Sequence, residues 1–405
     1  MKSKIVKSLI TVALIILTGW LLRYSWLQRH ISYEDYAYTV DEAKRLQYFP
    51  KAQYAHGLRA WFRNDADGAA GFFRQAVSQD VFLMDAWLKL AEAEALMGNP
   101  EKAQAILTFT DSRTARILRW KWSQTLLAHE LGMDDIFSGN INYFIAHGKI
   151  LQDAFQLLDT HFRGKTTAAL KALHPDNLAP YLKWLMRWGR TDNAHTVWQR
   201  IAETGNPDPQ TILQHVHFLV NKKRVKEAQA IWRPYTDKGG MTNAGFENGI
   251  TRRGFDWRYG SDSNGRWEIK RVGSPAYEGS YALQVFFAGR ENLSFHNLYQ
   301  IVPVEPLKPY RLTYWWRSEK VTTDQGPFVD IYGYANRGLY KKGPMITGTN
   351  DWRAEAMEFT PPENCQAVVV RLRRLPSGRF DSNIAGTLWL DNFRLEALAS
   401  KKQGD

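Results

Sequence analysis

Seven side chains in the C-terminal part of the chain could bind a ligand by ring stacking and charged hydrogen bonds. They are Trp315, Arg317, Asp330, Tyr332, Tyr334, Arg371 and Arg373. The aromatic rings offer flat faces to pyranose rings, and the charged groups can bind hydroxyls or uronic carboxylates. This use requires that their strands share one sheet. The alternative is a solvated sheet face with ordinary cross-strand salt bridges.

Asp391 is a second candidate, because it lies inside an apolar pattern. Residues 386–395 read Gly-Thr-Leu-Trp-Leu-Asp-Asn-Phe-Arg-Leu, which alternates with period two. A strict alternation puts Asp391 on the same face as Trp389 and Phe393. A buried carboxylate needs a hydrogen-bonding or cationic partner. The best candidate region for this partner is Gly-Phe-Glu-Asn-Gly at 245–249, which contains Glu247.

No residue set predicts catalysis. Glu247 and Asp391 are interpreted as structural, and no other pair of carboxylates is placed for glycoside hydrolysis. The sequence has no Gly-x-Ser-x-Gly, no phosphate-binding glycine loop and no His-Glu-x-x-His. We therefore expect a protein that is not an enzyme.

The candidate residues fall in a region that alternates with period two between frequent turn residues. This pattern predicts an antiparallel β-sandwich over residues 241–398, followed by a disordered tail at 399–405. Leu312, Tyr314 and Trp316 are expected to point into its core. The expected strands are 280–287, 298–304, 310–318, 328–334, 354–360, 367–374 and 387–395.

Residues 31–238 follow a helical period instead. Two pairs of segments align at a spacing of 34 residues, with small residues such as Ala69 and Ala103 followed four residues later by Phe73 and Leu107. Ala194 and Trp198 align with Ala228 and Trp232 in the same way. This pattern resembles the tetratricopeptide repeat, which implies an α-solenoid with a groove for a protein partner. The number of repeats stays open.

Residues 1–30 predict a membrane anchor. Lys2, Lys4 and Lys7 precede an uncharged run from Ser8 to Leu22, and Arg23 follows it. The lysines weakly favour a cytoplasmic amino terminus, so that the chain would cross the inner membrane once and most of it would be periplasmic or otherwise extracytoplasmic. A cleaved signal peptide is the alternative.

Charge and cysteine content narrow the class of partner. The formal net charge is +12 without a basic run, which favours anionic surfaces or polymers over nucleic acid. Cys365 is the single cysteine, so neither an internal disulfide nor a cysteine-based zinc site can form.

The sandwich region resembles the jelly-roll carbohydrate-binding modules attached to bacterial xylanases and cellulases. The similarity includes the Phe-Glu and Trp-Leu-Asp-Asn ends. Between them it runs through Gly-Ser-Tyr-Ala-Leu-Gln-Val at 279–285, Gln-Ile-Val-Pro-Val at 300–304, Pro-Tyr-Arg-Leu-Thr at 309–313, Asp-Trp-Arg at 351–353 and Phe-Thr-Pro-Pro at 359–362. The resemblance implies one structural calcium ion that ties the first strand to the last through Glu247 and Asp391. The alternative is that both acids bind backbone amides without a metal.

Together these patterns predict a multidomain protein with α-helices followed by β-strands. Our first hypothesis is an anchored, non-enzymatic protein whose repeats bind a protein and whose jelly roll binds polysaccharide, in cell-envelope or exopolysaccharide assembly. The second is a pure protein–protein assembly scaffold whose jelly roll has lost sugar binding. An enzyme with an unrecognised site is the third.

Overall fold

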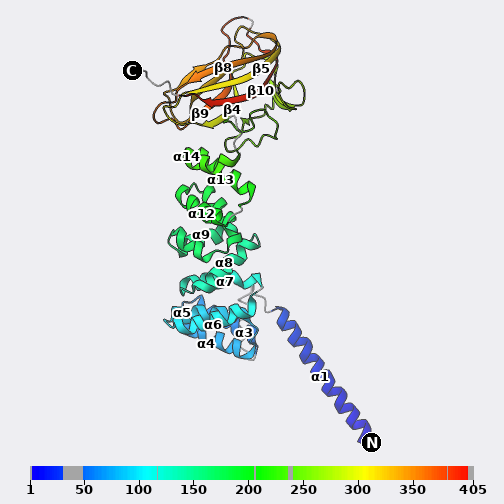
Figure 1. Ribbon diagram of the computed structural model, residues 1–405. Helices are drawn as coiled ribbons and strands as arrows, with labels where there is room; N and C mark the ends of the chain where they lie inside the picture. The colour runs from blue at the N-terminus through cyan, green and yellow to red at the C-terminus, as the bar shows by residue number, and fades with distance from the viewer. Residues whose placement is uncertain are drawn as a thin grey trace. The chain divides into compact units, whose positions relative to one another are not determined.

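The structure is a computed structural model that describes residues 2–30, 49–115, 117–204, 207–235, 240–380 and 382–399. The chain divides into two compact units, residues 1–184 and 185–405 (Figure 1). The described part contains thirteen α-helices: α1 Lys2–His30, α3 Pro50–Trp61, α4 Ala66–Gln79, α5 Met84–Leu96, α6 Pro100–Thr114, α7 Leu118–Glu130, α8 Asp134–Ala146, α9 Leu151–His161, α10 Thr166–Ala172, α11 Leu178–Arg187, α12 Thr191–Glu203, α13 Pro209–Asn221 and α14 Val225–Trp232.

Local sequence explains where several helices begin. Proline stands in the first turn of α3, α6 and α13, where its missing N–H costs no helical hydrogen bond. Asp65 caps α4 by accepting a hydrogen bond from the Gly68 N–H, and Asp208 caps α13 by accepting one from the Thr211 N–H. These signals divide the helical part into short helices rather than a few long ones.

Small residues allow neighbouring helices to approach closely. A Cβ atom on Gly57 would lie 2.4 Å from Phe73 Cε1, so α3 and α4 touch at a glycine. The positions aligned at a spacing of 34 residues are buried throughout: Ala69, Phe73, Ala76, Ala91, Ala103, Leu107, Thr110, Leu185, Ala194, Trp198, Leu219, Ala228 and Trp232. The helical character is confirmed, and the assignment to tetratricopeptide repeats stays a prediction.

Helix α1 contains an 18-residue segment, Val6–Arg23, with a mean hydropathy of 1.7 and no buried surface. By length and composition it could cross a membrane, and a signal sequence has the same properties. Predictions for residues 31–48, 236–239 and 400–405 lie outside the described residues.

The C-terminal β-strands form two five-stranded antiparallel sheets, which confirms the predicted sandwich. We call them the β5 sheet, in the order β2-β3-β10-β5-β8, and the β9 sheet, in the order β1-β4-β9-β6-β7. The strand bounds are β1 Arg258–Tyr259, β2 Trp267–Val272, β3 Ala282–Ala288, β4 Phe295–Pro303, β5 Tyr310–Val321, β6 Phe328–Gly333, β7 Tyr340–Lys342, β8 Gly348–Phe359, β9 Ala367–Arg374 and β10 Ala385–Ala397. All seven predicted strands exist, whereas β1, β2 and β7 were not predicted.

The predicted inward face of β5 is confirmed, since Leu312, Tyr314 and Trp316 belong to the buried core between the sheets. The strict alternation predicted for β10 is wrong. A β-bulge interrupts its pairing with β5 between Asp391 and Arg394, and Asn392 adopts a positive φ of 48°. Leu388 and Leu390 therefore face the core before the bulge and Phe393 faces it after the bulge, so Asp391 lies on the outer face of the sheet.

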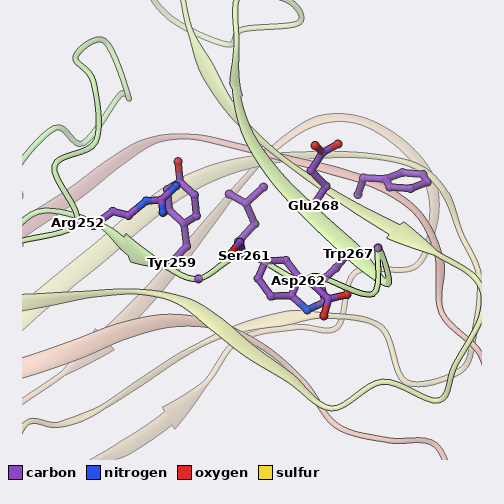
Figure 2. Close-up of a pocket in the computed structure, with 10 residues that line it drawn as sticks. Arg252, Tyr259, Ser261, Asp262, Trp267 and Glu268 are labelled. Carbon is purple, nitrogen blue, oxygen red and sulfur yellow. The ribbon is translucent and has the colours of Figure 1, made fainter.

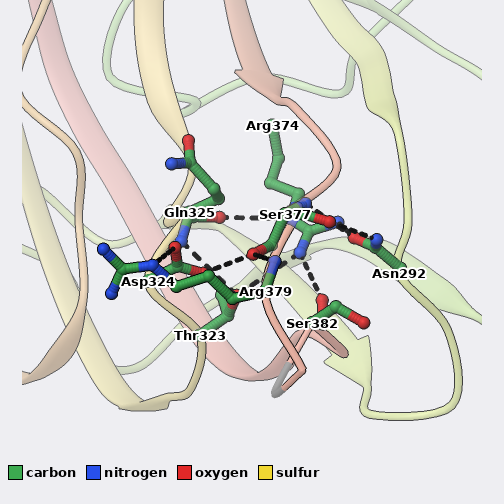
Figure 3. Close-up of polar contacts among 8 residues, drawn as sticks. All are labelled: Asn292, Thr323, Asp324, Gln325, Arg374, Ser377, Arg379 and Ser382. Atoms are coloured by element: carbon green, nitrogen blue, oxygen red, sulfur yellow. Dashed lines mark hydrogen bonds and ion pairs between the residues drawn. The ribbon is translucent and has the colours of Figure 1, made fainter.

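Arg374 ties together the loops at one end of the sandwich (Figure 3). Its fully buried guanidinium donates hydrogen bonds to the carbonyls of Leu293, Gln325 and Ser382, which lie in three different loops. It also donates to Asn292 Oδ1 at 2.9 Å. One cation thus satisfies backbone acceptors that burial would otherwise leave unpaired.

The last helices belong to the same unit as the sandwich. Trp232 Nε1 in α14 donates to Thr242 Oγ1 at 2.9 Å, and the Tyr334 hydroxyl donates to the Val220 carbonyl of α13 at 2.8 Å. The Gly254 N–H donates to His217 Nδ1 at 3.3 Å. Residues 185–235 are thus linked by hydrogen bonds to the sandwich and belong to one compact unit with it, whereas the predicted domain boundary lies near residue 240.

Candidate functional site

The seven residues predicted to form one binding face lie on two different sheets. Trp315 and Arg317 are on the outer face of β5, whereas the other five are on or beside β6 and β9 in the β9 sheet. The condition that all seven share one sheet is therefore not met. The two groups have to be considered as separate surfaces.

The outer face of the β5 sheet carries a cluster of aromatic rings around Trp315. The Tyr277 ring stacks on Trp315 with centroids 3.6 Å apart and an interplanar angle of 14°. Trp352 of β8 meets Tyr277 edge-on at 5.9 Å. Tyr277 remains 38% exposed, and Trp315 and Trp352 are half-buried. These rings form a partly solvent-facing aromatic surface of the kind that stacks on planar or apolar ligand faces.

Arg317 borders this cluster and supplies hydrogen-bond donors. Its guanidinium lies 5.8 Å from the centroid of the Trp389 ring on β10, and one of its nitrogens lies 3.9 Å from Asp351. The Arg317 side chain is 39% exposed. At this distance and exposure the ion pair with Asp351 is weak, so the guanidinium stays accessible to a polar ligand.

Asp391 and Glu247 hold the loop that carries Tyr277. Asp391 Oδ2 accepts hydrogen bonds from the N–H groups of Tyr277 and Glu278 at 2.8 and 3.2 Å. Glu247 Oε1 accepts from those of Ser280 and Tyr281 at 3.0 and 3.1 Å. Asp391 also pairs with Trp315 across the strands. The two acids thus fix the backbone of the ring that stacks on Trp315.

This arrangement bears on the expected calcium ion. Burial, and to a lesser degree the charge of Glu247, raises the pKa of Asp391, so the two carboxylates interact. Asp391 Oδ1 accepts a third amide hydrogen bond, from Asn392, so that at least three of the four carboxylate oxygens bind N–H groups. No group of three metal-binding side chains occurs among the described residues. The acids are thus satisfied by amides, and calcium stays a prediction.

On the β9 sheet, the carboxylate of Asp330 forms ion pairs with neighbouring arginines. It is fully buried on the outer face and accepts two hydrogen bonds from Arg371, at 2.9 and 2.7 Å, while Arg373 lies 3.5 Å away. The Arg371 guanidinium also lies 4.5 Å from the centroid of the Tyr332 ring. This is the cross-strand salt-bridge arrangement that was the alternative to ligand binding.

Tyr334 binds the helices rather than facing solvent. Its hydroxyl donates to Val220 of α13, and Ile301 on the outer face of β4 is only 2% exposed. Burial is the main cause that raises the pKa of Tyr334. Part of the outer face of the β9 sheet is therefore covered, and it fits ligand binding less well than the β5 sheet does.

Sequence reasoning missed Tyr277 and Trp352 as members of the aromatic surface. Tyr277 lies in a loop without periodicity, so no strand pattern could place it next to Trp315. The one available signal was Asp391 itself, because its need for a partner pointed to a segment that would cross β10. That segment is the loop at residues 277–281.

Comparisons with known proteins concern the sandwich. No family model matches the sequence, and no curated protein matches it. Similar solved structures include TmCBM61 in complex with β-1,4-galactotriose, with 19% identity over 40% of this chain and 100% of that chain and a TM-score of 0.29. Another is the CBM22-1 xylan-binding domain of Xyn10C from Paenibacillus barcinonensis, with 13% identity over 39% and 94% and a TM-score of 0.27.

A Stig cyclase, FisC from Fischerella sp. TAU, is similar to a comparable degree. It has 18% identity over 40% of this chain and 97% of that chain, with a TM-score of 0.30. Carbohydrate-binding modules and an enzyme thus occur side by side among the similar structures. At these identities and scores the likenesses assign neither a ligand nor an activity to this chain.

Proposed function

We propose that the chain is a membrane-anchored, non-enzymatic protein that binds polysaccharide through the outer face of its β5 sheet. The observation that carries the proposal is the stacked pair of Tyr277 and Trp315 beside Trp352. The partly exposed rings can stack on the apolar C–H groups of a sugar ring, and the neighbouring guanidinium can donate hydrogen bonds to its hydroxyls. Arg317, two residues from Trp315 on the outer face of β5, would bind those hydroxyls.

The helical part would dock a protein partner. Phe62, Phe82 and Leu96 are between 69% and 80% exposed, and exposed apolar side chains of this size favour protein contacts. In this proposal the helices are tetratricopeptide-like repeats. Their partner would belong to the machinery that assembles the cell envelope or an exopolysaccharide.

Helix α1 would anchor the protein in the inner membrane, with its amino terminus in the cytoplasm and the remaining chain in the periplasm or outside the cell. The segment Val6–Arg23 supports this by its hydropathy, and the lysines before it support the orientation. Fractionation of cells, followed by protease treatment of intact spheroplasts, would test both statements.

A glycan array probed with the full chain in lipid nanodiscs tests the proposed binding. We expect a wild-type signal on at least one polysaccharide and a loss of about tenfold or more in affinity for Trp315→Ala, because central aromatic contacts dominate such interfaces. Trp188→Ala is the matched control, since Trp188 is 57% exposed and lies in the turn between α11 and α12, outside the sandwich strands. No signal on neutral or acidic glycans would refute the proposal. Hydrolysis of a bound glycan would refute the non-enzymatic part.

The second candidate function is a protein scaffold without sugar binding. The observation that favours it is the hydrogen-bonded contact of Tyr334 with α13, which shows the sandwich supporting the helices within its own unit. In that case the wild type would bind no glycan, and neither Trp315→Ala nor Trp188→Ala would differ from it. Co-purification of the same partner protein by both variants would then support the scaffold.

A further inference from the structure

A pocket of about 410 Å³ lies at the β1–β2 edge of the sandwich (Figure 2). Residues of both sheets contribute to it, among them Tyr259 of β1 and Trp267 and Glu268 of β2. The loop between these strands supplies Ser261 and Asp262. The pocket is separate from the Tyr277–Trp315 stack and from the residues that hold it.

Arg252 is the cation of this pocket. Its guanidinium lies 4.0 Å from the centroid of the Tyr259 ring, which holds the planar group in place. No carboxylate in the described parts of the chain lies within ion-pair distance of it. A guanidinium that is oriented by a ring but not neutralised is a binding group for a planar anion, above all a carboxylate.

The backbone at Arg252 adopts a left-handed conformation. Arg252 has a positive φ of 59°, which is strained for a residue with a Cβ atom. The turn is stabilised by Asp256, which is 3% exposed and accepts hydrogen bonds from the N–H and hydroxyl of Thr251 at 2.6 and 2.9 Å. Strain that the surroundings enforce is a reason to look for a ligand-binding role.

Each acid of the pocket has a cationic partner, and the pair of Glu268 and Lys270 is more than half exposed. Asp262 accepts hydrogen bonds from Arg266, with Oδ1 2.7 Å from Arg266 Nη2, and Glu268 lies 2.7 Å from Lys270. An anionic ligand therefore meets Arg252 without an unpaired carboxylate beside it. Phe286, which is 43% exposed, adds an apolar ring surface to the lining.

We propose that this edge pocket binds a uronic sugar residue, with its carboxylate on Arg252 and its apolar face toward Phe286 or Tyr259. The proposal rests on the proposed function and narrows it to acidic polysaccharides. Ser261 would supply a hydroxyl for the sugar hydroxyls. Phe286 points to the same outer face of the β5 sheet as Trp389, because it pairs with Thr387 two residues away on β10.

The test is isothermal titration calorimetry of the full chain in nanodiscs with trigalacturonate and with its methyl ester. The ester keeps the sugar ring and removes the charge. We expect the wild type to prefer the acid by about tenfold, the strength of one charge-assisted contact, and Arg252→Gln to lose this preference. Arg253→Gln is the matched control, because it removes the same charge one residue away and lies outside the lining.

Two outcomes overturn the inference. One is equal affinity of the wild type for acid and ester, or no binding of the acid. The other is a preference that survives in Arg252→Gln, with its thermal unfolding unchanged, or that is lost equally in Arg253→Gln. Failure of the proposed function looks different, because no glycan would then bind to any variant. If Trp315→Ala abolishes binding of neutral glycans while the acid preference persists, the two sites are distinct.

Discussion

His215 should make the second unit sensitive to mild acid. The side chain lies in α13, is fully buried and stacks on Trp198 with centroids 4.9 Å apart. Neither ring nitrogen has a hydrogen-bond partner within the parts of the chain that the structure describes. Burial, and to a lesser degree the nearby His195, lowers the pKa of His215 from 6.5 to about 3. The folded protein therefore holds this imidazole neutral.

The sign and size of the effect follow from this pKa difference. Between pH 6.5 and about 3 the unfolded chain binds the proton and the folded chain does not, so the free energy of unfolding falls as the pH falls. Relative to neutral pH, His215 should remove about 1 kcal/mol at about pH 5.5 and about 3 kcal/mol at about pH 4.5. His217 on the same helix adds a similar loss, because burial, followed by Arg258 and Arg253, lowers its pKa to about 4.

Urea denaturation of the full chain near neutral pH and near pH 5.5, with hydrogen exchange of the α13 amides, measures the effect. His215→Phe keeps a ring against Trp198 and removes the titrating group. The variant should lose about 1 kcal/mol less than the wild type over this interval. His296→Phe, which changes an exposed histidine of β4, is the matched control variant. If His215→Phe and the wild type lose the same free energy, the assignment to His215 is refuted.

Three further predictions concern the loops of the sandwich. Asp391→Asn should lower the free energy of unfolding by about 2 to 4 kcal/mol and weaken glycan binding, because the loop amides lose an acceptor. The control Glu278→Gln changes a 61% exposed side chain on the same loop and should cost under about 1 kcal/mol. Equal losses of the two variants in urea denaturation would contradict this account. Arg374→Met should lower the free energy of unfolding by about 3 kcal/mol or more, since three carbonyls lose their donor. The control Arg379→Met, at an 80% exposed position, should lower it by under about 1 kcal/mol in the same measurement. Millimolar calcium should raise the unfolding temperature of the wild type but not of Glu247→Gln, and no shift in scanning calorimetry would mean that amides alone satisfy the two acids.

The sequence predicted well what depends on local periodicity. Alternation along β5 identified Tyr314 as a core residue and Trp315 as an outer one, because successive side chains of a strand point to opposite faces. The small residues at Ala69 and Ala103 likewise identified buried helix contacts, because close helix packing excludes bulk wherever it occurs. Neither inference needs any knowledge of distant contacts.

What the sequence could not predict depends on which strands become neighbours. Alternation shows that Trp315 and Tyr332 each point outward from their own strand, but it does not show that β5 and β6 belong to different sheets. The predicted seven-residue site failed at this step and not at the orientation of single residues. Residues that one strand supplies together, such as Trp315 and Arg317, stayed together.

The bulge in β10 shows how one irregularity links fold and site. Without it, Asp391 and Phe393 would share a face, so Phe393 would lie on the outer face of the sheet while Leu388 and Leu390 face the core. The extra residue at the bulge lets Leu390 and Phe393 both face inward while Asp391 faces the loop at residues 277–281. The requirement that a buried acid must have a partner was therefore correct, although the partner is a set of backbone amides. Because those amides carry the ring of Tyr277, the carboxylate that the sequence marked as structural also shapes the surface on which a sugar would stack.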